Sequence, residues 1–217
     1  LRFAEDYQYD TSSTPIVTTN GAVLHECSNG SNKLKNSDIL LIDFGLRNRN
    51  GYCSDITRDY PVNGKFNPIQ KDIYSIVLNA QLEAIKFIQV GLKYKDVHIK
   101  AATIIAEGLI SLGFMKGKAE DAVKEGAHAL FFPHGLGHML GLLAHDMKNL
   151  GEEVVGYDEN NKRSTQFGLS YLRLAKELKE NFVLTVEPGI YFIKSLILKC
   201  QREGLHTSFI NYEKSLN

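Results

Sequence analysis

Phe132-Pro133-His134-Gly135-Leu136-Gly137-His138-Met139-Leu140-Gly141, followed by His145-Asp146, is the stretch around which the rest of the chain can be interpreted. Histidines at i and i+4 can mark a helical zinc site, but that signature carries Glu directly after the first His, and Gly135 stands there. One proline and three glycines in this stretch disfavour a helix. The many glycines indicate backbone packed closely around a ligand. For one of the three histidines, the alternative is a hydrogen-bonded imidazole in the core with no role at the site.

Two aspartates lie on the arms of one predicted hairpin. Asp43 stands in Leu-Ile-Asp-Phe-Gly and Asp55 in Ser-Asp-Ile-Thr-Arg, and both flanks are strand-like. Carboxylates on paired strands can lie side by side on one sheet face. Repulsion between the two carboxylates would raise the pKa of one of them unless a cation lay between them. For this pair taken alone, two unrelated solvent-facing acids remain the alternative.

Glu187 interrupts the apolar stretch Val-Leu-Thr-Val-Glu-Pro-Gly just before a Pro-Gly turn. Burying a carboxylate is costly unless it is paired or metal-bound, although a single acid at a strand end is more often exposed than functional. Taken together, Asp43, Asp55, His138 and Glu187 form a set of oxygen ligands with one imidazole and no sulfur. This set suits Mn²⁺, Co²⁺ or a catalytic Zn²⁺ pair better than a structural zinc.

The hydrophobic pattern predicts an α+β fold. Apolar residues at helical spacing predict a helix from Asn67-Pro68 to Gly91, a second over 97–112 that Gly113 ends, and a shorter one at 119–125. The polar stretch 151–168 is expected to be a loop. No βαβ alternation is visible. The strand-like segments are 16–18, 22–25, 38–44, 52–60, 129–132, 182–186 and 190–193.

The composition excludes several classes of partner. The 217 residues include 25 basic and 25 acidic side chains, so no net charge attracts nucleic acid or an anionic membrane. The longest apolar runs are too short to span a bilayer. Cys27, Cys53 and Cys200 are scattered and odd in number, which argues against disulfides or a thiolate metal site and favours a cytoplasmic protein. A small or peptide-like partner is expected.

Five ordered motifs resemble those of the Xaa-Pro peptidases, prolidase and aminopeptidase P, and more distantly methionine aminopeptidase. The resemblance covers residues 15–212. It implies the pita-bread fold, an antiparallel sheet with helix pairs in two pseudo-symmetric halves, over a catalytic domain at 15–217; residues 1–14 are expected to be the tail of an upstream region. The motifs are Leu41-Ile42-Asp43-Phe44-Gly45, Ser54-Asp55-Ile56-Thr57-Arg58, Pro133-His134-Gly135-Leu136-Gly137-His138, His145-Asp146 and Thr185-Val186-Glu187-Pro188-Gly189.

The resemblance implies a two-metal site. Asp43 and Asp55 would bind the pair, with Asp55 bridging, and His138 and Glu187 would hold the metal on the other side. Glu187 would also take or return a proton. The implied cofactors are two divalent cations, Mn²⁺ before Co²⁺ or Zn²⁺. The implied substrate is a proline-containing di- or oligopeptide, cleaved before the proline.

The resemblance also assigns four residues around the substrate. His25, in Val-Leu-His, would lie near the substrate, and His145 would contact the scissile carbonyl or pass protons. His134 is expected to support the site at the substrate rather than to bind metal. Arg173 resembles the prolidase arginine that meets the free carboxylate of a dipeptide, a task that suits a guanidinium fork; a plain surface arginine is the alternative. Arg173 favours a dipeptidase over aminopeptidase P.

Two departures from the family pattern bear on activity. The family's fifth ligand, a glutamate in a Gly-x-Arg-x-Glu-Asp strand, has no match before Asn217, so the last strands are expected to be missing and the fragment inactive. The spacing from Asp43 to Asp55 is a residue longer than in the commonest members, and the extra residue falls at the hairpin tip. The full-length protein is expected to be a homodimer. A non-catalytic pita-bread peptide-binding module and a metal-free hydrolase of the creatinase type remain the rival hypotheses.

Overall fold

The computed structural model of the protein describes residues 9–19 and 33–216. In that part of the chain, β2 (Ile16–Thr18), β3 (Ile39–Phe44) and β5 (Ile56–Pro61) form an antiparallel sheet in the order β2-β3-β5. The short strands β1 (Asp10–Thr11) and β4 (Leu46–Arg47) pair beside it. The expected strand at 22–25, and with it His25, lies outside the described residues.

The register of β3 against β5 places the two aspartates differently from the expected hairpin. Asp43 lies opposite Thr57, and Asp55 comes just before the first paired residue of β5. The strand predicted at 52–60 therefore begins four residues late. The reason is that residues 52–54 pair loosely with β4 and turn toward the later half of the chain, where the Cys53 N–H donates to the carbonyl oxygen of Gly141 at 2.7 Å.

The two long helices confirm the periodicity and capping signals. α2 (Pro68–Phe87) begins with a capping box, because the Asn67 side chain accepts from the Gln70 N–H at 2.9 Å and the Gln70 side chain accepts from the Asn67 N–H. α3 (Tyr94–Ser111) is followed by Gly113 at φ +77°, a conformation that glycine adopts without penalty. α4 (Ala119–Lys124) also forms as expected.

The second half of the chain contradicts several strand predictions. The first two residues of 129–132 end a 3₁₀ turn, η1 (Ala127–Leu130), and the other two form no strand. Residues 182–186 and 190–193 form no ladder with another described segment beyond a single bridge from Leu184 to Met139. Residues 183–187 do bond to 136–140 in an antiparallel register, through Leu140 to Val183, Thr185 to His138 and Glu187 to Leu136, but these bonds do not complete a strand. Such a segment has the same hydrophobic pattern as a strand, so periodicity alone could not separate the two.

Short helices also occur where the sequence predicted none. The polar stretch 151–168 begins with one helical turn, α5 (Glu152–Val155), flanked by η2 (Lys148–Leu150) and, later, η3 (Leu169–Tyr171). After residue 193 the chain forms α6 (Lys194–Arg202) and α7 (Tyr212–Leu216). These elements are short, and short helices depend on tertiary contacts more than on propensity.

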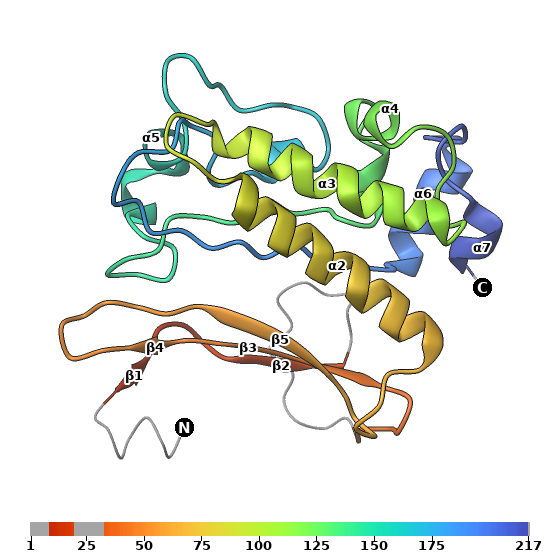
Figure 1. Ribbon diagram of the computed structural model, residues 1–217, viewed down its shortest axis with the longest axis horizontal. Helices are drawn as coiled ribbons and strands as arrows, with labels where there is room; N and C mark the ends of the chain where they lie inside the picture. The colour runs from red at the N-terminus through yellow and green to blue at the C-terminus, as the bar shows by residue number, and fades with distance from the viewer. Residues whose placement is uncertain (1–8, 20–32, 217) are drawn as a thin grey trace.

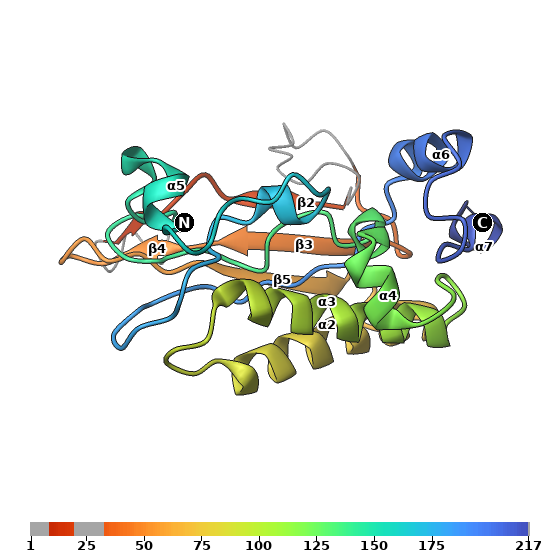
Figure 2. The same ribbon diagram turned by 90° about the horizontal axis from the view of Figure 1, so that it is seen from above.

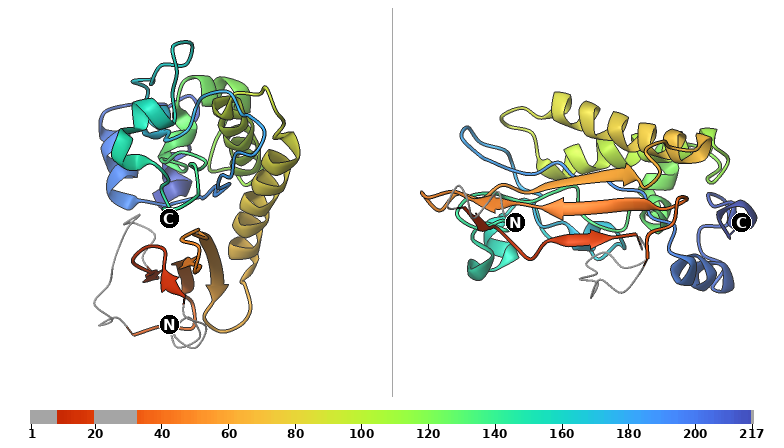
Figure 3. Two further views of the ribbon diagram at one scale, coloured as in Figure 1. Left: turned by 90° about the vertical axis from the view of Figure 1, so that its left-hand side faces the viewer. Right: turned by 90° about the horizontal axis from the view of Figure 1, so that it is seen from below.

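The sheet forms one side of the molecule, and α2, α3 and the later segments lie over it (Figures 1 and 2). The right-hand view of Figure 3 places α6 and α7, in blue, at the end remote from β1 and β4. The main core is built by α3, which buries Tyr94, Ile105 and Leu109 together with Phe131 and Phe132. No helix within residues 9–19 and 33–216 is long and apolar enough to cross a membrane.

This core holds two histidines that the metal chemistry does not use. His98 and His128 are both fully buried, with ring centroids 6.1 Å apart. Burial, together with neighbouring His128, His134 and Lys95, holds the pKa of His98 well below its usual value. Burial lowers the pKa of His128 to about 4, an effect to which His206 adds and which the backbone of Val123 opposes.

Acid is therefore expected to destabilise the fold through His128. Its folded pKa of about 4 lies below the ordinary 6.5, so the unfolded chain binds the proton first and the free energy of unfolding falls as the pH drops from 6.5 toward 4. The full shift is equivalent to about 3 kcal/mol. Denaturant titrations at pH 7 and pH 4.5 should show a smaller loss for His128→Leu than for the wild type. Lys118→Gln, at an exposed position, is the control, and equal losses in wild type and His128→Leu would contradict the prediction.

Candidate metal centre

Three of the four predicted ligands converge between the sheet and the later half of the chain. The Nε2 atom of His138 lies 3.3 Å from Oδ2 of Asp55 and 3.1 Å from Oε1 of Glu187. One ligand atom from each residue lies within 4.8 Å of the others. Asp43, near the end of β3, lies close enough to Asp55 and Glu187 for their charges to act on its pKa. Segments distant in sequence thus bring one imidazole and three carboxyls together.

Hydrogen bonds between two loops hold His138 and Glu187 in place. The His138 N–H donates to Oγ1 of Thr185 at 3.0 Å, and the Thr185 N–H donates to the carbonyl oxygen of His138 at 3.0 Å. The hydroxyl of Thr185 also donates to Oε1 of Glu187 at 2.8 Å. From α3, the buried Tyr94 hydroxyl donates to the carbonyl oxygen of Thr185. Thr185 and Tyr94 therefore fix both ligands, a role that sequence inspection did not assign to them.

Gly137 is required by the closeness of these two loops. A Cβ at this position would lie 2.1 Å from the carbonyl oxygen of Thr185 and 2.7 Å from the Tyr94 hydroxyl. The first of these atoms is backbone and cannot rotate away. The glycine therefore allows the approach that places His138 beside Glu187.

Gly137→Ala should lower the free energy of unfolding by about 1–3 kcal/mol, the usual range for overpacking a tight interior site. Because the loops must separate, we also expect weaker metal binding. Thermal unfolding and equilibrium dialysis with Mn²⁺ measure the two effects. Gly64→Ala is the control, since nothing lies within 4 Å of a Cβ there, although its φ of +79° adds a local backbone penalty. Unchanged stability and metal affinity in Gly137→Ala would show that the loops separate without cost.

The charges in the cluster are strongly coupled. Burial alone would lower the pKa of His138, but hydrogen bonds to Asp55 and Glu187 raise it to about 9. The same contact with His138 lowers the pKa of Asp55, and it lowers that of Glu187 against the opposing effect of burial. Burial and the nearby carboxylates of Asp55 and Glu187 raise the pKa of Asp43 to about 6. Three carboxyls compete here for one positive charge.

The residues present fit divalent metal ions. The crowded carboxylates face a proton on His138 that a cation would replace, and the donor atoms are the hard oxygens and single imidazole that Mn²⁺, Co²⁺ or catalytic Zn²⁺ accept. The orientation of the His138 ring is also set, because Nδ1 lies 3.0 Å from the Met139 carbonyl oxygen and Nε2 faces the carboxylates. The site is thus arranged for metal binding within the described residues.

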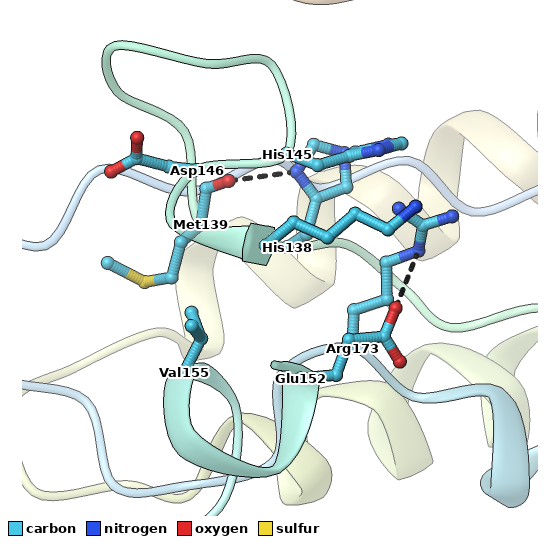
Figure 4. Close-up of a pocket in the computed structure, with 8 residues that line it drawn as sticks. His138, Met139, His145, Asp146, Glu152, Val155 and Arg173 are labelled. Atoms are coloured by element: carbon cyan, nitrogen blue, oxygen red, sulfur yellow. Dashed lines mark hydrogen bonds and ion pairs between the residues drawn. The ribbon is translucent and has the colours of Figure 1, made fainter. Parts of the chain in front are cut away.

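A small pocket extends from the cluster and contains two of the predicted substrate residues. His145 and Arg173 line it together with His138 and Glu152 (Figure 4). Lys148 lines it as well. The rings of His145 and His138 are perpendicular, with centroids 4.4 Å apart. Burial and then the positive charges of His138 and Arg173 lower the pKa of His145 to about 4. His145 is therefore neutral near pH 7, with one ring nitrogen able to donate and the other to accept.

His134 lies beside the site but not among the ligand atoms. Its ring contacts Phe132 edge-on at 5.0 Å and Tyr191 at 5.3 Å, and its Nδ1 lies 2.9 Å from the Gly135 carbonyl oxygen. It is absent from the described group of residues that could hold an ion. The supporting role of His134 at the substrate stays a prediction. His25 lies outside the described residues.

The chain was compared with known proteins. The model of metallopeptidase family M24 matches residues 2–210. A probable Xaa-Pro aminopeptidase of Botryotinia fuckeliana is 39% identical over 193 residues, and one of Fusarium vanettenii is 40% identical over 199 residues. These alignments cover 89% and 91% of this chain but 40% of each relative, so the chain spans about two fifths of the length of these curated relatives.

Solved structures agree with the sequence comparison. Escherichia coli aminopeptidase P matches with a TM-score of 0.69 at 34% identity, and proline aminopeptidase P II from Yersinia pestis with 0.68 at 37% identity. Each match covers 83% of this chain and 37% of the other. The chain thus has the pita-bread fold of these metallopeptidases, with a carboxylate–imidazole cluster inside it. The chain belongs to metallopeptidase family M24.

Proposed function

We propose that the protein hydrolyses the peptide bond before proline in Xaa-Pro dipeptides or N-terminal Xaa-Pro peptides, with the dipeptide activity favoured. The observation that carries the proposal is the meeting of Asp55, His138 and Glu187 beside a pocket that contains Arg173. The names of the similar proteins, Xaa-Pro aminopeptidases and aminopeptidase P, support the reaction. Arg173 is the reason for favouring the dipeptide, because a guanidinium suits a free carboxylate.

Each residue near the cluster is assigned a role in this proposal. Asp43, Asp55, His138 and Glu187 hold two divalent metal ions, which when bound supply Lewis acidity and activate water. Glu187 takes the proton of the attacking water at its carboxylate and returns it to the leaving proline nitrogen. His145 donates a hydrogen bond from its neutral ring to the scissile carbonyl oxygen. His25 and His134 line the substrate, and Arg173 binds its carboxylate.

Finer features of the proposal concern the whole protein. Mn²⁺ is the favoured metal, with Co²⁺ or Zn²⁺ as alternatives; a zinc-substituted Escherichia coli aminopeptidase P is among the similar structures. Residues 15–217 are assigned to one catalytic domain. Free Cys53 and Cys200 support a reducing, cytoplasmic location, and by resemblance the complete protein forms a homodimer.

The test is proline release from an Xaa-Pro dipeptide by the complete protein after metal removal and re-addition of Mn²⁺, Co²⁺ or Zn²⁺. We expect no turnover without metal, recovery with one of the three ions, and close to two ions bound per chain by elemental analysis. Metal binding without turnover on any Xaa-Pro substrate would refute the proposed reaction. Turnover that survives complete metal removal would favour the creatinase-type hydrolase instead. A protein that neither binds metal nor hydrolyses any of these substrates would favour the peptide-binding module.

A further inference from the structure

Arg173 contacts a chain of charged side chains that lies outside the metal cluster. Glu152 begins α5, and its Oε1 lies 3.8 Å from Nε of Arg173 (Figure 4). Its other oxygen, Oε2, lies 3.1 Å from Nη2 of Arg163. One carboxylate therefore lies between two guanidinium groups, of which only Arg173 lines the pocket.

Arg163 is itself held firmly. Its Nη1 donates to the carbonyl oxygens of Ser170 at 2.9 Å and Leu172 at 3.3 Å, and its guanidinium lies 4.7 Å from the centre of the Tyr157 ring. The Tyr157 hydroxyl donates to the same Leu172 carbonyl at 2.7 Å, and Tyr157 is buried. Since Leu172 directly precedes Arg173, Arg163 fixes both the backbone before Arg173 and the carboxylate that faces its side chain.

This arrangement leaves one edge of the Arg173 fork for a ligand. Glu152 faces the Nε edge. Nη1 of Arg173 is buried and has no hydrogen-bond partner within residues 9–19 and 33–216. Figure 4 shows the guanidinium end turned toward His145, and Arg173 is among the charges that act on that ring. A buried donor without a partner is costly unless a ligand satisfies it, and a carboxylate matches the guanidinium fork.

We propose that Glu152 is a positioning residue for Arg173: Arg163 holds Glu152, and Glu152 fixes the guanidinium so that its free edge receives the carboxylate of a short peptide substrate. An arginine side chain loses much rotamer freedom when it is fixed in one conformation. The carboxylate of Glu152 fixes the Arg173 side chain before the substrate binds, so substrate binding does not have to offset this entropy loss. The inference rests on the proposed function and names its substrate class, peptides whose proline carries a free carboxylate.

The experiment compares an Xaa-Pro dipeptide with its C-terminal amide, which lacks the carboxylate, in the complete protein. For Glu152→Ala we expect about a tenfold rise in KM for the free dipeptide with kcat changed by less than about twofold, in the range for removing a supporting contact. The amide should be unaffected. Glu152→Gln should retain only part of the affinity, because its single amide oxygen can accept from only one of the two arginines and its NH2 group cannot accept from the other. Glu159→Ala, in the same loop and exposed, is the matched control.

The double variant Arg173→Ala with Glu152→Ala decides whether Glu152 acts through Arg173. If it does, KM for the dipeptide equals that of Arg173→Ala alone. Equal losses on dipeptide and amide would indicate a merely structural role and overturn the inference. A lower KM in Glu152→Ala would also overturn it, because Glu152 would then be repelling the substrate carboxylate.

A binding measurement separates this inference from the proposed function. If the wild-type protein hydrolyses neither these two compounds nor a longer Xaa-Pro peptide, the proposed function fails while the positioning question remains answerable. Calorimetric titration of dipeptide and amide into wild type and Glu152→Ala then decides it. Weaker binding of the free dipeptide alone supports positioning, and identical binding by the two proteins overturns it.

Discussion

Glu187→Gln is expected to lower kcat/KM on an Xaa-Pro dipeptide by about 100- to 10,000-fold, the range for losing a general base. The substitution keeps the size of the side chain and its bond from the Thr185 hydroxyl, so the loops should stay paired. What it removes is the negative charge that His138 contacts at 3.1 Å and the site for the transferred proton. The measurement is steady-state proline release with saturating Mn²⁺.

The control for this substitution is Glu203→Gln, an exposed acid that directly follows α6. It should leave kcat/KM and metal content unchanged. Metal content of Glu187→Gln should fall as well, because one carboxylate ligand is lost. Retention of near wild-type turnover by Glu187→Gln would remove Glu187 from both roles and leave the cluster without a base.

Arg173→Ala is expected to reduce kcat/KM for Xaa-Pro dipeptides by about 30- to 900-fold and to affect longer Xaa-Pro peptides much less. The loss corresponds to about 2–4 kcal/mol for truncating one partner of a buried charged pair. A longer peptide carries no carboxylate on its proline, so it has little to lose at this position. Rates on a dipeptide and a tetrapeptide with the same first two residues give the comparison.

Arg202→Ala, at an exposed position in α6, is the matched control and should change neither rate. Arg173→Lys should recover only part of the dipeptide rate, because an ammonium cannot form the two parallel bonds of the guanidinium. Equal losses of Arg173→Ala on short and long substrates would remove the reason for favouring a dipeptidase and leave aminopeptidase P activity as the better proposal.

The sequence by itself predicted the long helices and the residues of the candidate metal centre. Asp43, Asp55, His138 and Glu187 are few in kind, hard in ligand type and placed in ordered motifs, so their chemistry could be inferred without coordinates. The Asn67 cap and the apolar period of α2 are local signals, since a helix forms its hydrogen bonds within its own segment.

Only the tertiary structure decided how the later loops pair and which residues support the site. Residues 182–193 have the pattern of strands, yet they bond to the glycine-dense loop, because pairing depends on partners distant in sequence. The supporting contacts also produce no periodic pattern in the sequence, because each joins a single side chain to a different segment. They are made by Thr185, Tyr94, Arg163 and Glu152. Hydrogen bonds within a helix join residues that are close in sequence, so the local sequence predicts them. Contacts between distant segments form only when the whole chain folds, so the local sequence does not predict them.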